Sequence, residues 1–158
     1  NFIERVFVYS RWLDYLQNDG TIKGLIAFHT AHKLMFMAHS PQFYRETGAL
    51  VANMKSMDRA VLSASYLSLL TKTFGLRATV KKNVNVLQHC AGYFKKQLAS
   101  EEKRELTGII GAYASGFYPL IVPVTILNHY VNKYDQPYLK QQWYLNPHPI
   151  ELKLRNHA

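Results

Sequence analysis

Residues 28 to 42 read "FHTAHKLMFMAHSPQ", and this stretch sets the pattern of the fold. Its apolar residues recur at helical spacing, so we expect a helix that begins after a capping residue, Thr21. Pro41 disfavours helical geometry at Ser40, and Ser40 can cap the next helix with Pro41 in its first turn. The sequence therefore predicts one helix that ends at "HSP" and a second that starts there.

Helical spacing also continues on both sides of this stretch. Further helices are predicted over about 1–17, over 42–74 with a break near 54–58, from 84 to about 99, from 100 to about 114, and from Pro119 or Pro123 to Tyr134. The fold class is therefore all-α, a single-domain bundle of about five to seven helices. Alternating apolar and charged residues after 149 (Ile150, Leu152 and Leu154 against Glu151, Lys153 and Arg155) predict an extended C-terminal arm.

Three finer expectations concern the second half of the chain. The segment "FGLRATVKKN" at 74–83 is predicted to be a basic loop. Gly92 lies inside a predicted helix, which suggests that another backbone approaches closely there. Ser100 opens the next helix, with Lys103 at the capping-box position where Glu is preferred.

The composition indicates a folded, basic protein. Of 158 residues, 48% are hydrophobic and 18% are charged, and Lys and Arg outnumber Asp and Glu by 19 to 10, a formal net charge of +9. A compact domain this basic attracts polyanions. Nucleic acid is the first candidate, and an anionic membrane surface is the second.

Cysteine usage and hydropathy limit the possible classes. With Cys90 as the single cysteine, the chain forms no internal disulfide, four-cysteine zinc site or cysteine-bound iron–sulfur cluster of its own, which fits a reducing cytoplasm. We expect no cofactor in this domain. The longest apolar run, "FYPLIVPVTIL" at 117–127, is about half a membrane span, so no membrane crossing is expected. Cys90 falls on an apolar helical stripe and is not expected to be a nucleophile.

Three histidines of the opening stretch share one side of the predicted helix, because His32 lies three residues after His29, and His39 seven after His32. Lys33 lies near that side. Three interpretations stay open: a metal site with a further ligand from elsewhere, polar contacts to a partner, or histidines hydrogen-bonded inside a helix junction. For His39, at a helix end, we expect the third, because buried carbonyls there need side-chain partners.

A second group of polar residues occupies 81–96, "KKNVNVLQHCAGYFKK", which contains four lysines and no acid. Asn85, Gln88 and His89 stand at i, i+3 and i+4 on one helical strip. Lysines at the ends can hold a phosphate backbone while amides contact sugars or bases. The strip is flanked by Lys81, Lys82, Lys95 and Lys96. The alternative is a solvated lysine face.

Two neighbouring features add to this surface. Tyr93 and Phe94 differ by about 100° around a helix, so one should be in the core while the other can stack a base. Arg45 offers a phosphate contact, and an ion pair with Glu46 is the alternative for that side chain. We see no nucleophile elbow, phosphate-binding glycine loop or paired carboxylate motif.

Four blocks of the sequence resemble the YbgA-like family of helical domains. They are "FHTAHKLMFMAHSPQFYRETGALVAN", "NVLQHCAGYFKK", "GFYPLIVPVTILNHY" and "YLNPHPIELKLRN", which together span nearly the whole chain. The opening "NFIERVF" resembles the point where, in many relatives, this domain follows an iron–sulfur thiouracil desulfidase domain. The family pattern has histidine where this chain has Asn83, which argues against a catalytic or metal role there.

The resemblance implies an accessory function. It implies that 1–158 is one helical domain cut from a longer tandem protein, and that it delivers thiolated tRNA to the desulfidase domain. Stand-alone bacterial relatives have been linked with photoreactivation. We therefore expect a cytoplasmic RNA-binding domain, whose partners are tRNA or other structured RNA and a desulfidase domain in cis.

Two alternatives to RNA binding remain open. One is a catalytic or metal-dependent pocket formed by His29, His32 and His89. The other is a structural cap of the desulfidase domain or a homo-oligomer, with Trp12 or Trp143 as exposed aromatic residues that become protected on assembly.

Overall fold

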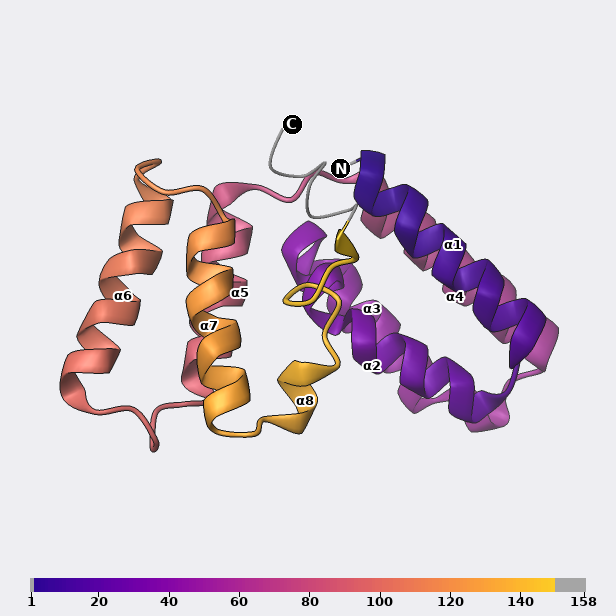
Figure 1. The fold of residues 1–158 in the computed structure, drawn as a ribbon. Helices are drawn as coiled ribbons and strands as arrows, with labels where there is room; N and C mark the ends of the chain where they lie inside the picture. Colours follow the sequence, from indigo (N-terminus) through magenta and orange to yellow (C-terminus); the bar gives the residue numbers. More distant parts are fainter. Residues whose placement is uncertain (1, 150–158) are drawn as a thin grey trace. The chain divides into compact units, whose positions relative to one another are not determined.

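A computed structural model describes residues 2–149 of the chain (Figure 1). Every regular element in this range is helical, and no strand occurs in it, so the all-α class is confirmed. Seven α-helices have twelve or more residues, and a four-residue helix and one 3-10 turn complete the described part. The expected C-terminal arm lies outside the described residues.

The chain divides into two compact units, residues 1–78 and 79–158. Unit 1 contains α1 (Phe2–Asn18), α2 (Ile22–His39), α3 (Pro41–Ala52), the turn η1 (Met54–Ser56) and α4 (Arg59–Gly75). Unit 2 contains α5 (Val80–Gly92), α6 (Ser100–Ala114), α7 (Ile121–Lys133) and α8 (Pro137–Lys140). That the whole chain is a single domain stays a prediction.

The start of α2 and its junction with α3 follow the sequence prediction. The Thr21 hydroxyl accepts a hydrogen bond from the backbone N–H of Gly24 at 3.0 Å, so Thr21 is the N-cap of α2. Ser40 ends α2 and caps α3, because its backbone N–H donates to Phe36 O and its hydroxyl accepts from the N–H of Phe43. Local capping chemistry is sufficient to place this junction.

The core of unit 1 is built from aromatic residues. Trp12 of α1 stacks on Tyr66 of α4 with ring centroids 5.2 Å apart, and Phe28 of α2 meets Trp12 edge-on. Phe36 and Phe74 extend the cluster toward the end of α4. Trp12 is 1% exposed, so the expectation that it is a surface aromatic is wrong. Paired rings of this kind contribute beyond their buried area.

In unit 2, helices α5, α6 and α7 pack against one another side by side (Figure 1). Leu87 of α5 and Leu127 of α7 are fully buried between them, as is Phe94 just after α5. The short helix α8 packs against α7 and buries Leu139. Unit 2 therefore has a core of its own.

Three finer expectations for this unit are corrected. Thr79 caps α5, which starts at Val80, so the expected loop is shorter than 74–83. The box at the start of α6 uses Glu102, whose carboxylate accepts from the Ala99 N–H at 2.8 Å, and not Lys103. Gly92 is the last residue of α5, and no atom lies within 4 Å of the position of an added Cβ, so no backbone approaches it closely.

Candidate nucleic-acid interface

The histidines of α2 lie inside unit 1. His29 and His32 are both buried. His29 Nδ1 is 3.0 Å from the hydroxyl of Tyr66. His32 Nδ1 is 2.7 Å from the carbonyl oxygen of Phe28, and its ring stacks on the Phe28 ring with centroids 4.0 Å apart. Because a carbonyl oxygen only accepts, Nδ1 of His32 carries the proton.

Burial also keeps these two imidazoles neutral. It lowers the pKa of His29 to about 4, with a smaller contribution from the charge of Lys33. Burial lowers the pKa of His32 to about 3, against the opposing effect of the hydrogen bond to Phe28. The expectation that His29 and His32 contact RNA from an exposed face is therefore corrected, and the interpretation as a helix junction is confirmed. Within 2–149, no cluster of three His, Cys, Asp or Glu side chains is arranged to hold a metal ion.

His39 joins the ends of three helices in unit 1. Its Nδ1 lies 2.8 Å from the carbonyl oxygen of Leu76, the C-cap of α4, so the ring provides a side-chain partner for this helix end. Its Nε2 lies 3.4 Å from the carboxylate of Glu4 in α1. The expected structural role of His39 is confirmed.

The two candidate phosphate contacts of unit 1 differ in exposure. Arg45 of α3 is exposed, whereas Lys33 of α2 is half-buried. Glu46, the expected ion-pair alternative, accepts a hydrogen bond from Gln42 at 2.8 Å. In the described part of the chain, Arg45 has no carboxylate within ion-pair distance, so its charge faces solvent.

Helix α5 presents the predicted polar strip to solvent. Its buried face carries Asn83, Val86, Leu87 and Cys90. The side chains of Asn85, Gln88 and His89 are all exposed, as are those of Lys81, Lys95 and Lys96, while Lys82 is half-buried. We call the exposed set Lys81, Asn85, Gln88, His89, Tyr93, Lys95 and Lys96 the α5 surface.

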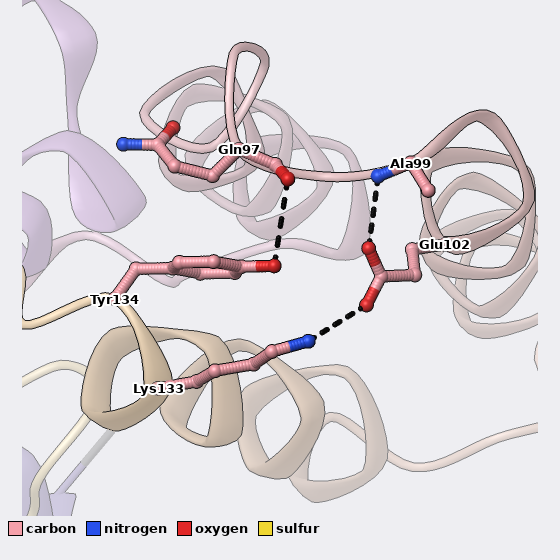
Figure 2. A network of polar contacts seen from close by, with 5 residues as sticks. All are labelled: Gln97, Ala99, Glu102, Lys133 and Tyr134. Atoms are coloured by element: carbon pink, nitrogen blue, oxygen red, sulfur yellow. Dashed lines mark hydrogen bonds and ion pairs between the residues drawn. The ribbon is translucent and has the colours of Figure 1, made fainter.

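Among residues 79–149, the lysines of the α5 surface form no ion pair with a carboxylate. Glu102 is bonded to Lys133 at 3.0 Å and to the Ala99 N–H (Figure 2), and Asp135 pairs with Lys140. The hydrogen bond from Ala99, followed by that from Lys133, lowers the pKa of Glu102. Two of the acids described in this unit are thus engaged by lysines of α7 and α8, away from α5.

The sequence around α5 adds to this imbalance. From residue 59 to residue 100 there is no Asp or Glu, while the stretch contains Arg59, Lys72, Arg77, Lys81, Lys82, Lys95 and Lys96. Lys81 and Lys82 lie in the first turn of α5, where the helix dipole is also positive. This end of α5 therefore has a positive potential from both side chains and backbone.

An aromatic pair lies at the other end of the α5 surface. Tyr93 stacks on Tyr138 of α8 with ring centroids 5.5 Å apart and planes 18° from parallel, and His89 meets Tyr93 edge-on at 5.6 Å. Tyr93 is 37% exposed and Phe94 is fully buried, so the predicted division between these two neighbours is confirmed. A pre-ordered ring that is partly exposed, such as Tyr93, can stack a nucleobase.

A groove of about 370 Å³ lies between α5 and α6 beside this surface. Gln88 and Thr107 line it together with the small or apolar residues Val84, Ala91, Ile110 and Gly111. Lys103 precedes Thr107 by four residues and shares its face of α6, whereas Glu101 and Glu105 are turned roughly 120° or more away. The groove thus combines an amide, a hydroxyl and apolar walls with a nearby cation.

Two further residues of α5 are structural. Asn83 is buried, and its side-chain oxygen accepts a hydrogen bond from the hydroxyl of Tyr144 at 3.0 Å. Cys90 is buried, and burial raises the pKa of its thiol to about 12. A thiol with so high a pKa is a poor nucleophile at neutral pH.

Comparison with known proteins identifies the family. Residues 33–149 match the family model described as "Protein of unknown function (DUF1722)", which is more than half of the chain. The chain belongs to the DUF1722 family. It is 30% identical over 146 residues to "Uncharacterized protein YbgA" of Escherichia coli (strain K12), covering 91% of this chain and 86% of that protein. No solved structure matches the chain.

The DUF1722 match covers the α5 surface and the groove. It begins at Lys33, so His29 and His32 precede the matched region. The sequence predicts the lysines, the amides and His89 of the surface, and one exposed ring at either Tyr93 or Phe94, but it does not reveal Tyr138 or Thr107. Tyr138 reaches Tyr93, and Thr107 reaches the groove, through the packing of α8 and α6 beside α5, which no local spacing signals.

None of the helices in residues 2–149 has the combination of length and apolar character required to span a bilayer.

Proposed function

We propose that this DUF1722 protein is an RNA-binding accessory module that holds tRNA through the α5 surface and presents thiolated tRNA to an iron–sulfur desulfidase domain. The observation that carries the proposal is the composition of one exposed helix face. Exposed lysines stand at both ends of the surface, Lys81 at one and Lys95 and Lys96 at the other, and amides, an imidazole and a stacked tyrosine pair lie between them.

The charges support binding of a phosphate backbone. Surface lysines that are already paired with carboxylates gain little from a phosphate, because the existing pair must first be broken. Lys133 is paired with Glu102 in this way, and Lys140 with Asp135. Lys81, Lys95 and Lys96 are exposed and have no carboxylate partner among residues 2–149, so they can release counterions from a nucleic acid.

The centre of the surface favours RNA with unpaired bases over duplex DNA. Gln88, Asn85 and His89 offer donors and acceptors that can reach 2′-hydroxyl groups or base edges. The Tyr93–Tyr138 pair offers a stacking platform, and a base stacked on an aromatic side chain contributes about 1–3 kcal/mol. Loops of tRNA contain unstacked bases, whereas a regular duplex keeps its bases stacked inside.

The presentation step rests on the resemblance to tandem desulfidase proteins. The residues of this chain do not fit an iron–sulfur cluster, because Cys90 is its single cysteine and is buried with a raised pKa. The cluster ligands would therefore come from the desulfidase partner. The part assigned to this chain is to bind and orient the RNA.

The proposal is tested by measuring tRNA binding by fluorescence anisotropy at fixed salt, with duplex DNA of equal charge as the competing ligand. Lys81→Glu combined with Lys82→Glu should weaken tRNA binding by tenfold or more, as expected for the loss of two phosphate contacts and their replacement by repulsion. Glutamate is favourable in the first turn of a helix, so α5 should remain folded.

A charge-matched control separates this site from general attraction to polyanions. Lys23→Glu combined with Lys55→Glu makes the same change in net charge at exposed positions of unit 1. This control should bind tRNA within about threefold of the unmodified protein at physiological salt. Equal loss in both double variants, or equal binding of tRNA and DNA by the unmodified protein, would contradict the proposal.

A further inference from the structure

The proposed phosphate and stacking contacts do not use the groove between α5 and α6. Its volume is about 370 Å³, at the lower end of the roughly 300–1,000 Å³ that small-molecule sites occupy. Gln88 and Thr107 supply its polar groups. The other lining residues are apolar or small: Val84, Ala91, Ile110, Gly111 and Ala114. The groove can therefore hold one flat organic group, and its polar atoms indicate which kind.

Gln88 offers the groove an amide without a partner. Its side chain is exposed and forms no hydrogen bond with another residue of 2–149. Thr107 differs, because its hydroxyl donates to the carbonyl oxygen of Lys103 at 2.7 Å and therefore presents an acceptor to the groove. An amide places a donor beside an acceptor, which complements the N–H and C=O groups at the edge of a nucleobase. A purely apolar occupant would cover this amide without satisfying it, at a cost in free energy.

The apolar walls suit the faces of a base. Ile110 is buried and Val84 and Ala91 are half-buried, whereas Gly111 is exposed. An added Cβ at Gly111 would meet no atom within 4 Å, so the space beside it is open to a ligand. A base that enters removes its flat faces and these walls from water, which is favourable. A phosphate group would gain nothing from such walls.

Lysines lie toward both ends of the groove. Because α5 and α6 run antiparallel (Figure 1), Val84 lines one end and Thr107 the other. Lys81 precedes Val84 by three residues and Lys103 precedes Thr107 by four, so each lysine lies on the groove side of its helix, one turn beyond the lining. Both lysines are exposed. A nucleotide within a strand has a phosphate on either side of its sugar, so this arrangement favours a base that belongs to a polynucleotide.

We propose that the groove between α5 and α6 receives one unstacked nucleobase of the RNA held on the α5 surface, with the edge of the base hydrogen-bonded to Gln88. This inference rests on the proposed RNA-binding function and adds a base pocket to its phosphate and stacking contacts. Gln88 belongs to both the α5 surface and the groove, so a strand held by the lysines passes the mouth of the groove.

A matched pair of glycines in α6 tests the pocket. Gly111 lines the groove and Gly108 does not, and an added Cβ meets no atom within 4 Å at either position. Leucine is a better helix former than glycine, so Gly111→Leu and Gly108→Leu should both fold. In fluorescence anisotropy, Gly111→Leu, which fills the groove, should weaken tRNA binding about tenfold, and Gly108→Leu should change it by less than about twofold.

The salt dependence separates this inference from the proposed function. Gly111→Leu removes no charge, so its log–log salt slope should equal that of the unmodified protein. Unaltered tRNA binding by Gly111→Leu, or the same loss in Gly108→Leu, would overturn the base pocket and leave the RNA-binding proposal standing. An unmodified protein that does not bind tRNA would overturn both.

Nuclear Overhauser effects locate the base directly. Base protons of a bound oligouridine should give intermolecular effects to the methyl groups of Val84 and Ile110, which line the groove. The methyl groups of Ile109, which is not a lining residue, should give none. Effects from sugar protons alone, or from no proton of the oligomer, would overturn the inference, because either result leaves the base outside the groove.

Discussion

His29 and His32 couple the stability of unit 1 to pH. Each imidazole is packed among aromatic rings, with one nitrogen bonded to Tyr66 or to the Phe28 carbonyl. Burial lowers their pKa from 6.5 to about 4 and about 3. The unfolded chain therefore binds protons over a pH range where the folded chain does not, and acid favours unfolding in that range.

We predict that the free energy of unfolding falls as the pH decreases from 6.5 toward 4, with the histidine contribution fully present above 6.5. Urea titrations at a series of pH values measure this. The range between pH 6.5 and about 5 isolates the effect, because most carboxylates titrate below it.

Matched variants identify the group responsible. His32→Gln should reduce the pH dependence in that range, even though it destabilises the core. His89→Gln, on the exposed face of α5, should leave it unchanged. A flat profile between pH 6.5 and 5 in the unmodified protein would rule out neutral histidines in the core.

At the scale of single elements, helix starts depend on a few capping side chains. Asp58 precedes α4, and its carboxylate accepts hydrogen bonds from the backbone N–H groups of Ala60 at 2.9 Å and Val61 at 3.2 Å. α4 supplies Tyr66 and Phe74 to the core of unit 1. Loss of this cap therefore destabilises the helix on which the aromatic cluster is built.

Asp58→Ala should lower the free energy of unfolding by about 1 kcal/mol, and Asp58→Asn, which preserves an acceptor at the cap, by only a few tenths. Urea denaturation with both variants measures the difference. Equal losses in the two would mean that the charge of Asp58, rather than its hydrogen bonds, stabilises the start of α4.

Elements of this kind are predictable from sequence, because their signals are local. Thr21, Ser40 and Pro41 act on the backbone within three residues, and the helix boundaries there agree with the prediction. The sequence predicts a loop over 74–83 and therefore a helix from 84, four residues after the observed start of α5 at Val80. The Thr79 cap outweighs the polarity of this segment, and Lys81 and Lys82 are helical.

The direction in which a helix face points is less predictable. Helical spacing shows that His29 and His32 share a side, but it does not tell whether that side meets the core or solvent. In α2 the face meets Tyr66 and Phe28, and in α5 a face of similar polarity remains exposed. The neighbours in space decide between the two outcomes, and they come from helices distant in sequence.

For the whole molecule, the basic character is shared by both units. Unit 1 has nine Lys and Arg against five Asp and Glu over 2–78, and unit 2 has eight against four over 79–149. Net charge alone would therefore attract a polyanion to either unit. The salt dependence of binding distinguishes a defined set of contacts from such general attraction.

We predict a log–log salt slope of about −3 to −5 for tRNA, as expected for roughly four to six phosphate contacts. Replacing Lys95 and Lys96 together by Gln should reduce the magnitude of the slope by about 1.5 to 2. Anisotropy titrations across a salt series measure both values, with Lys23→Gln and Lys55→Gln as the pair that should leave the slope unchanged. An unaltered slope in the Lys95/Lys96 variant would remove these residues from the interface.

The burial of Cys90 has a practical consequence for the dynamics of unit 2. Cys90 is the single cysteine and lies on the buried face of α5. It can therefore react with an alkylating reagent only after α5 moves away from the helices packed against it. The rate of alkylation under native conditions thus reports how often unit 2 opens locally, in the manner of hydrogen exchange but at one known atom. Slower alkylation with tRNA bound would mean that the ligand closes α5 onto its bundle.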